Sequence, residues 1–356
     1  MTPASNAGDS GTTTHWTRIF HVDLFNRARG DDAPPPPARG TPAAFTPVRS
    51  RRDAYPGRRS ERMTLFAADG YPLTATRYAA AGTTRGHVVV AGAIGVPQRY
   101  YRRFAEFAAL SGYSTLTFDY RGVALSAPST LKGFRMNYFD WGRQDLAAAV
   151  DAMSASRVPL YAVGHAFGGH AFGVLPNHDK LTALCTFGIG AGWHGWMPPL
   201  ERLRALATWH VLGPLLTRWK GYLPWSLLGM GEDIPLDVYQ QWKRWCRYPS
   251  FFFDDPSMRY IIRSFDRVRT PLMAANAIDD RRSPPKSRDA FMAGYRNAAQ
   301  ERLDIEPARV GMRAIGHMGY FKADAVALWE FALAWLESRG MLPREYAPHV
   351  RQRVPA

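Results

Sequence analysis

The sequence predicts an α/β protein: a doubly wound, mostly parallel sheet with a helical segment inserted late in the chain. Short apolar runs alternate with segments of about 10 to 15 residues whose apolar positions recur at helical spacing, an order typical of parallel β-α-β units. The alternation stops near Gly190 and resumes near Pro271, which marks the insertion. With 356 residues, 46% of them hydrophobic, the chain has enough apolar material for a large buried core.

The elements of this core follow one another in a regular order. Asp69-Gly70 lies between two short segments, Met63–Phe66 and Leu73–Thr76, and this pattern indicates a β-hairpin. The strands expected after the hairpin are the short runs His87–Ala91, Ser114–Phe118, Pro159–Val163, Ala183–Phe187, Pro271–Ala277 and Val310–Ile315. The helices expected from their apolar spacing are Tyr100–Leu110, Asp140–Ala155 and Ala325–Glu337. We therefore assign residues 61–190 and 264–340 to the core.

The insertion, residues 191–263, is rich in tryptophan and mostly helical in pattern. Seven of the chain's eleven tryptophans lie in it, at positions 193, 196, 209, 219, 225, 242 and 245. We expect it to form a lid that shapes an apolar pocket over the site. The alternative is a plain helical subdomain whose aromatic residues form its own core, and a lid also needs such a core. An exposed apolar underside would favour acyl or aromatic substrates.

The two ends of the chain differ from the core in composition. Residues 1–60 contain the run Pro34–Pro37 and nine arginines, a composition that cannot bury enough apolar surface to offset its ordering entropy. We expect a disordered basic tail there and a short C-terminal tail at residues 341–356. Across the chain, 45 basic and 30 acidic residues give a net charge of +15. A basic tail suits an anionic surface, either nucleic acid or lipid headgroups, although an arginine-biased proteome explains it more simply. We do not expect nucleic acid as a partner, because no known nucleic-acid motif supports it.

Several classes of protein and cofactor are disfavoured by what the sequence lacks. Two cysteines, Cys185 and Cys246, cannot form a disulfide framework or a zinc ribbon, and no metal-ligand motif is present. Gly190–Gly195 matches a dinucleotide-binding glycine pattern, but Trp196–Pro199 follows it instead of a clear helix. Neither a secretory signal nor an apolar run long enough for a membrane helix is visible. We therefore expect a cytoplasmic protein without a metal or another cofactor.

The segment Leu160–Gly169 (LYAVGHAFGG) carries the clearest functional signal. A buried strand runs into a tight, glycine-flanked turn and then into a helix start with small residues, which is the setting of the nucleophile elbow G-x-S-x-G. Gly164 and Gly168 are needed because the turn is strained and packs closely against its neighbours. The central position, a serine in the motif, is Ala166 here, and a methyl group cannot attack a carbonyl.

The partners of such a nucleophile follow in the chain order acid, then histidine. Asp279-Asp280 follows the strand Pro271–Ala277, and His317 lies in a glycine-flanked loop after the last expected strand. We prefer Asp280 over Asp279 as the acid, and the alternative for either is a solvated turn aspartate.

An oxyanion hole is also expected near the elbow. The loop Ala91–Gly95, after the first parallel strand, suits one backbone amide donor, either Ala93 or Ile94. The second donor is the N–H of Phe167, which directly follows the nucleophile position.

On these residues the chain resembles the α/β-hydrolase superfamily. It is similar to a bacterial group with serine-aminopeptidase-like or lysophospholipase-like cores, which shares Ala-Gly-Ala-x-Gly-Val-Pro-Gln-Arg-Tyr-Tyr (here 91–101) and Gly-His-x-Gly-Tyr/Phe-Phe (here 316–321). The resemblance covers roughly residues 63–340. It implies the α/β-hydrolase fold and a triad of a serine at position 166 with Asp280 and His317. Alanine at position 166 departs from this pattern, and the substrate does not carry over.

Three hypotheses about function follow from this site. In the first, which we favour, the protein is an esterase-like serine hydrolase that lacks its nucleophile and is inactive as it stands. In the second, it is a pseudo-hydrolase that binds an apolar ligand or a partner without turnover. In the third, Asp280 and His317 act alone as a general base. The expected ligand is a small-molecule ester or an apolar acyl substrate.

Overall fold

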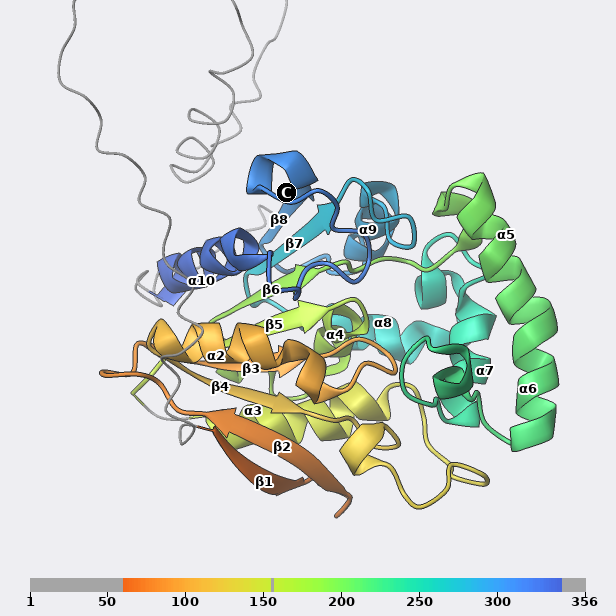
Figure 1. Cartoon of the computed structure of the whole chain (residues 1–356), viewed down its shortest axis with the longest axis horizontal. Coiled ribbons are helices and arrows are strands. Elements are labelled where there is room, and N and C mark those ends of the chain that lie inside the picture. Colours follow the sequence, from red (N-terminus) through yellow and green to blue (C-terminus); the bar gives the residue numbers. More distant parts are fainter. Residues whose placement is uncertain (1–59, 155–156, 341–356) are drawn as a thin grey trace, which may run out of the picture. The chain divides into compact units, whose positions relative to one another are not determined.

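A computed structural model of the chain describes residues 60–154 and 157–340. Within this part, eight strands form one sheet in the order β1-β2-β4-β3-β5-β6-β7-β8 (Figure 1). The strands are β1 (Ser60–Phe66), β2 (Pro72–Tyr78), β3 (Gly86–Ala91), β4 (Tyr113–Phe118), β5 (Leu160–His165), β6 (Ala183–Phe187), β7 (Leu272–Ala277) and β8 (Gln300–Ile305). From β4 to β8 all neighbours are parallel, and the β1–β2 hairpin joins β4 in antiparallel fashion. The predicted mostly parallel sheet is confirmed. The expected tails lie outside the described residues, apart from Ser60.

Helices cover both faces of the sheet (Figure 1). Those on one face are α2 (Arg102–Leu110) and α10 (Val326–Gly340), and those on the other are α3 (Ala147–Met153), α4 (Phe167–Ala171) and α9 (Pro285–Met292). Side chains of β3 alternate between the two layers: Val88 and Val90 pack with α2 and α10, whereas Val89 and Ala91 pack on the opposite side. A sheet covered on both faces needs strands that are apolar throughout, which explains why these strands were visible as short apolar runs.

The prediction of a last strand at Val310–Ile315 is wrong. The eighth strand is β8, and Pro307–Val310 forms a single 3₁₀ turn after it. β8 lies at the edge of the sheet and pairs with β7, so its surface is only partly covered and most of its side chains are polar. Met312 and Ile315, which suggested a strand, are buried by the packing of a loop. An apolar run therefore fills the core here without joining the sheet.

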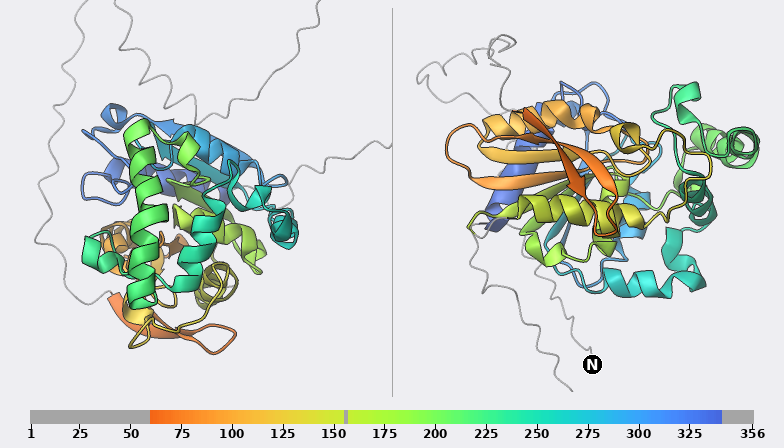
Figure 2. Two further views of the ribbon diagram at one scale, coloured as in Figure 1. Left: turned by 90° about the vertical axis from the view of Figure 1, so that its right-hand side faces the viewer. Right: turned by 90° about the horizontal axis from the view of Figure 1, so that it is seen from below.

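The segment between β6 and β7 lies beyond the carboxyl ends of the parallel strands (Figure 1). Its helices are α5 (Pro199–Ala207), α6 (Gly213–Lys220), α7 (Leu236–Trp245) and α8 (Arg259–Phe265). A π-helical turn, Thr208–Leu212, joins α5 to α6, and the left view of Figure 2 shows one continuous helix. The expected boundary at residue 263 falls within α8, whose Ile261 and Phe265 belong to the main core. We call residues 191–263 the inserted segment.

Two negative findings concern the residues that the structure describes. None of their helices combines the length and the apolar character that crossing a bilayer requires. Their His, Cys, Asp and Glu side chains form no group of three or more that could hold a metal ion.

Candidate active site

The turn between β5 and α4 carries residue 166 at a strained apex. Ala166 has φ 47° and ψ −103°, a conformation that costs a non-glycine residue about 1–3 kcal/mol. Its backbone N–H donates to the Phe187 carbonyl oxygen at 2.8 Å, which fixes the apex against β6. A Cβ on Gly168 would lie 2.1 Å from the Ala91 carbonyl oxygen, so α4 can approach β3 this closely only with glycine at that position. The strand, the bend and the helix therefore have the arrangement of a nucleophile elbow, with a methyl group at its centre.

Asp280 and His317 meet at the same end of the sheet. Asp280 follows β7, is almost fully buried, and its Oδ2 lies 2.9 Å from Nδ1 of His317. The same oxygen accepts the Tyr320 hydroxyl at 3.1 Å. Oδ1 accepts the backbone N–H groups of Arg282 at 3.0 Å and Ser283 at 2.9 Å. Four hydrogen bonds thus fix the orientation of the carboxylate beside the imidazole.

Asp279, the other candidate acid, binds the histidine loop rather than the imidazole. Its two carboxylate oxygens accept the backbone N–H groups of Ile315 at 2.9 Å and Gly316 at 3.1 Å. These bonds fix the backbone immediately before His317. The two adjacent aspartates therefore have different tasks: Asp279 orders the loop, and Asp280 contacts the ring.

The surroundings of Asp280 favour its charged form. Burial by itself would raise the pKa of this carboxyl, but the His317 imidazole and the backbone N–H groups of Ser283 and Arg282 outweigh burial, so the pKa of Asp280 lies below its ordinary value. Because a carboxylate only accepts, Nδ1 of His317 carries the proton between them. Nε2 of His317 is left as the basic nitrogen, without a hydrogen-bond partner among the described residues, and the ring lines a cavity.

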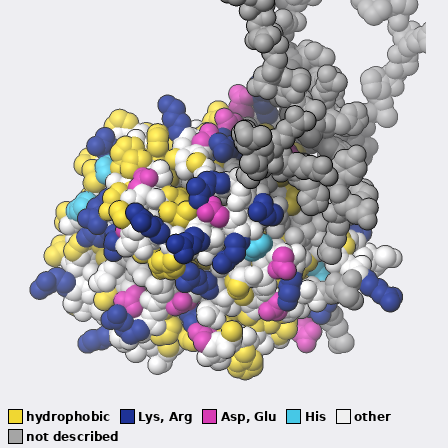
Figure 3. Space-filling model, turned by 180° about the vertical axis from the view of Figure 1, so that it is seen from behind, with side chains coloured by type: hydrophobic (Ala, Val, Ile, Leu, Met, Phe, Trp, Pro, Cys, Tyr) yellow, Lys and Arg dark blue, Asp and Glu magenta, His cyan; other side chains and the backbone are white. Residues whose placement is uncertain are grey.

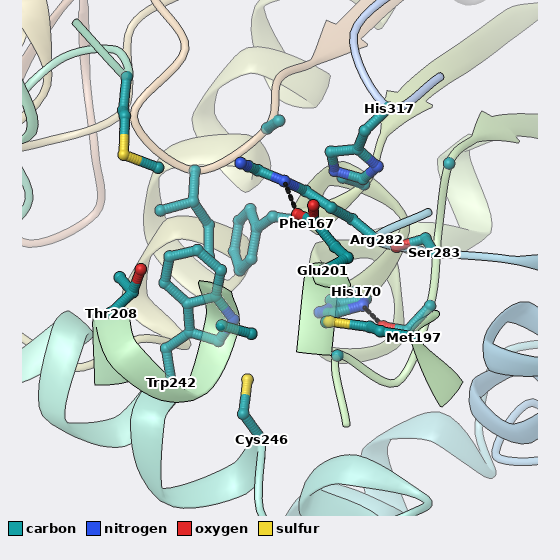
Figure 4. Close-up of a pocket in the computed structure, with 18 of the residues that line it drawn as sticks. Phe167, His170, Met197, Glu201, Thr208, Trp242, Cys246, Arg282, Ser283 and His317 are labelled. Atoms are coloured by element: carbon teal, nitrogen blue, oxygen red, sulfur yellow. Dashed lines mark hydrogen bonds and ion pairs between the residues drawn. The ribbon is translucent and has the colours of Figure 1, made fainter. Parts of the chain in front are cut away.

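This cavity, of about 490 Å³, lies between the end of the sheet and the inserted segment (Figure 4). Ala166, Phe167 and His317 line it from the core. The apolar side chains that line it from the inserted segment are Met197, Ala205, Trp209, Trp225, Met230, Trp242, Cys246 and Phe251. One ion pair joins the two sides, since Nε of Arg282 donates to Oε1 of Glu201 at 3.2 Å (dashed in Figure 4). Glu201, Arg204 and Thr208 also line it from the inserted segment, so polar groups occur on both sides of a mostly apolar cavity.

Comparisons with known proteins identify the fold. No protein-family model and no curated protein matches the sequence. Among solved structures, the chain is similar to a soluble variant of monoglyceride lipase from Saccharomyces cerevisiae in complex with a substrate analogue, with 17% identity and a TM-score of 0.56, covering 78% of this chain and 94% of that one. It is also similar to the α/β-hydrolase GrgF from Penicillium sp., with 15% identity and a TM-score of 0.53, covering 79% and 98% of the two chains. An esterase from Pyrococcus furiosus has 13% identity and a TM-score of 0.52, with 80% and 91% covered. The chain has the α/β-hydrolase fold.

Within this α/β-hydrolase fold, a series of hydrogen bonds connects three loops of the site. The Ala93 N–H donates to the Tyr101 hydroxyl at 2.8 Å, and this hydroxyl lies 3.0 Å from Nδ1 of His165. Nε2 of His165 lies 2.9 Å from the carbonyl oxygen of His317. Because a carbonyl only accepts, Nε2 carries the ring proton and Nδ1 accepts from Tyr101. Burial, together with the nearby His317, lowers the pKa of His165 to about 3, so its ring is neutral.

The same hydrogen bonds distinguish the two alternatives in the predicted oxyanion hole. The sequence left Ala93 and Ile94 as alternatives, but the Ala93 N–H is already bonded to Tyr101. In the described part of the chain, no acceptor is bonded to the backbone N–H of Ile94 or of Phe167, and both residues line the cavity. The Ala93 N–H is therefore occupied in this structure, whereas the N–H groups of Ile94 and Phe167 are available to a ligand.

Three further residues of this hydrolase-fold site were missed from the sequence. Tyr101 and Tyr320 lie in the motif segments 91–101 and 316–321. Their place in these segments is the sequence signal that could have identified them as residues of the site. The third is His170, which lies in α4. Its ring lies 2.9 Å from both the Tyr138 hydroxyl and the Gly190 carbonyl oxygen, beside the cavity (Figure 4). Burial lowers the pKa of His170 to about 3. No spacing in the sequence marked this histidine as buried.

Proposed function

We propose that this protein is an esterase-like α/β-hydrolase whose nucleophile position holds Ala166, so that it binds an apolar carboxylic ester without cleaving it through an acyl-enzyme. One combination of features supports the proposal: the strained elbow, the Asp280–His317 pair and the cavity occur at one end of one sheet. A site built for binding alone gains nothing from an alanine in a strained conformation, so the elbow favours a hydrolytic ancestry.

The groups around the elbow suit each step of ester cleavage once a hydroxyl is present. A serine at position 166 would transfer its proton to Nε2 of His317 as its oxygen bonds to the ester carbonyl carbon. The Ile94 and Phe167 N–H groups would stabilise the resulting oxyanion. The protonated His317 then donates to the leaving alkoxide, and a water molecule hydrolyses the acyl-enzyme by the same sequence. Asp280 stabilises the imidazolium in both half-reactions.

The lining of the cavity supports an apolar acyl group as the part of the substrate that is recognised. Trp209, Trp225 and Trp242 reach it from the inserted segment, which we propose is a lid. The ion pair between Glu201 of this segment and Arg282, two residues after Asp280, supports a link between the lid and the acid loop. The similar monoglyceride lipase structure holds a substrate analogue. A cytoplasmic location stays a prediction, with which two buried free cysteines are compatible.

The decisive experiment installs the missing hydroxyl. We expect Ala166→Ser to hydrolyse p-nitrophenyl esters of short or medium acyl chains and to be labelled by a fluorophosphonate. The parent should lack both activities, since loss of a serine nucleophile costs up to about a million-fold in turnover. The matched control is Ala205→Ser, which adds the same hydroxyl to the same cavity away from the elbow and should stay inactive. A serine at 166 that is inert to both reagents in a folded protein contradicts the proposal.

A second candidate function rests on the free Nε2 of His317, which lines the cavity. The His317–Asp280 pair alone would suit a general base that removes a proton from water or from a substrate. Turnover by the unaltered chain that His317→Ala abolishes would establish this function. If neither the parent nor Ala166→Ser turns over substrate while both bind a lipophilic ester tightly, the protein is a binding pseudo-hydrolase.

A further inference from the structure

The outer face of the inserted segment exposes a long apolar stripe. Fifteen large apolar side chains are exposed among the described residues, and nine of them fall between residues 200 and 230. These nine are Leu200, Leu203, Val211, Leu212, Leu215, Trp219, Leu227, Leu228 and Met230. The first six lie on the continuous helix Pro199–Lys220, and each is at least 43% exposed, so they face away from the packed side of the helix. We call these six residues the apolar stripe.

The stripe is not required by the packing of the fold. α5 contains three leucines, yet none of its residues is buried. Leu203, Leu215 and Trp219 are 64%, 63% and 66% exposed. A helix of a soluble protein ordinarily turns its apolar side toward the core, and contiguous exposed apolar patches mark interaction sites. The inner side of the same helix already lines the cavity through Ala205, so the stripe is a second apolar face.

Basic residues outnumber acidic ones on the helix that carries the stripe. Arg202, Arg204, Arg218 and Lys220 lie on the same helix, whose only acidic residue is Glu201. Glu201 is mostly buried and is paired with Arg282 and Arg204, so it adds little negative charge to the outer face. Figure 3 shows the molecule from behind rather than this outer face, and there too basic side chains are spread between apolar ones. The helix therefore carries a net charge of three positive units beside its apolar stripe.

We propose that the apolar stripe docks on a lipid bilayer that contains anionic headgroups. Apolar side chains flanked by arginine and lysine, on a helix of 22 residues and therefore about 33 Å long, suit a helix that lies in the plane of the interface. A second copy of the chain fits this face less well, because it would bring two sets of the same cations together. This inference concerns a surface outside the cavity and does not depend on whether the site cleaves esters.

Docking would bring the cavity close to the membrane. Ala205, Thr208 and Trp209 line the cavity from the helix that carries the stripe on its outer side. A π-helical turn lies at its middle, where it weakens the regular hydrogen-bond pattern. One helix would then separate the cavity from the bilayer, and lipid would contact this helix directly. An apolar ligand would have only a short path from the bilayer to the cavity.

Co-sedimentation of the full chain with vesicles tests the proposal. We expect binding to vesicles of phosphatidylcholine with phosphatidylglycerol, and binding that weakens as salt is added. The double variant Leu203→Glu/Leu215→Glu should bind at least about tenfold more weakly, because charges replace two leucines that would enter the bilayer. Arg218→Ala and Lys220→Ala should each weaken binding about fivefold, the effect of one cation near an anionic surface. Since all these side chains are at the surface, the thermal unfolding midpoint checks that the variants fold.

Matched controls and contrary outcomes keep the test sharp. Phe66→Glu and Leu110→Glu change exposed apolar residues outside the inserted segment and should leave vesicle binding unchanged. Equal binding to phosphatidylcholine alone, or equal binding by the Leu203→Glu/Leu215→Glu variant, would overturn the proposal. A parent dimer that this variant converts to a monomer would also overturn it, because the stripe would then be an interface between two copies. Quenching of tryptophan fluorescence by brominated acyl chains gives an independent measurement, and Trp219→Phe should remove most of it.

Discussion

At the floor of the cavity, Asp280 takes part in four hydrogen bonds, whereas α5 of the inserted segment, on the other side of the same cavity, has no buried residue. By the floor we mean the elbow and the loops that carry Asp280 and His317. At the elbow, the backbone contact between Gly168 and Ala91 tolerates no extra atom. The inserted segment has open space around Gly229 and an apolar outer side.

The two sides of the cavity are therefore under different physical constraints. The floor needs fixed geometry, because a proton and an oxyanion must meet their partners within a few tenths of an ångström. The inserted segment needs apolar surface, which has no preferred direction and tolerates movement. The same chemical change made on each side of the cavity should therefore have different effects.

Adding one methyl group should separate the two regions most clearly. In the floor, the Cβ of Gly168→Ala would lie 2.1 Å from the Ala91 carbonyl oxygen and 2.8 Å from its carbon, atoms that cannot move without shifting β3. We expect a loss in the free energy of unfolding on the order of 4 kcal/mol or more, or failure to fold. In the inserted segment, Gly229→Ala meets no atom within 4 Å and bears only the cost of its left-handed backbone, about 1–2 kcal/mol.

Urea unfolding of the two variants measures this contrast, with the parent as reference. A loss below about 1 kcal/mol for Gly168→Ala would mean that β3 and α4 can separate easily, and the rigid floor would be an incorrect description. A loss for Gly229→Ala as large as that for Gly168→Ala would equally remove the distinction between the regions.

The floor could be predicted from the sequence because its constraints are local. The elbow is encoded by Gly164 and Gly168, two residues before and after Ala166. A strand that bends sharply into a helix needs glycines there, because the backbones pack closely. Asp280 and His317 could be placed because parallel strands end at one edge of a sheet, so loops distant in sequence meet there. The preference between Asp279 and Asp280 had little local basis; only the structure gives each of them its partner.

What could not be predicted depends on which face of an element meets the rest of the protein. The sequence pattern indicates that Leu203 and Leu215 lie in helical segments, but not that their side chains point outward. The edge strand β8 was missed for the same reason, since a half-covered strand can be polar, while Met312 and Ile315 are buried in a loop. The occupation of the Ala93 N–H could not be predicted either, because its partner is the hydroxyl of Tyr101, which comes from the following helical turn.

Acid should weaken the floor through its two buried histidines. Burial lowers the pKa values of His165 and His170 from 6.5 to about 3, so between these pH values the unfolded chain binds a proton at each position that the folded chain does not. Above pH 6.5 both histidines are neutral in the folded and in the unfolded chain, so they do not change the free energy of unfolding. As the pH falls below 6.5, only the unfolded chain takes up these protons, and the free energy of unfolding decreases. The expected slope is about 1.4 kcal/mol per pH unit for each histidine, or roughly 2.7 kcal/mol each between pH 6 and pH 4.

Urea unfolding at several pH values tests this linkage by its slope rather than by absolute stability. His170→Gln removes one titrating ring, so the fall in stability with acid should be shallower by about 1.4 kcal/mol per pH unit. Tyr138→Phe is the matched control, because it removes the hydroxyl that faces His170 but leaves the ring buried, and should keep the parent slope. An unchanged slope in His170→Gln would mean that this histidine is protonated in the folded chain.

The smallest effect is also the most specific one, because a single substitution should change sign between the two regions. In the floor, Ala166→Gly relieves the backbone strain at φ 47°, about 1–3 kcal/mol, while glycine adds an entropy cost of about 0.5–1 kcal/mol, so the protein should become more stable by about 1 kcal/mol. In the helix of the inserted segment, Ala207→Gly should destabilise by about 1 kcal/mol, since no strain offsets the same entropy. Calorimetric melting of both variants gives the signs. If both destabilise, the elbow is relaxed and its shape follows from packing alone; opposite signs mean that the floor keeps a strained turn although its central residue has no hydroxyl to present.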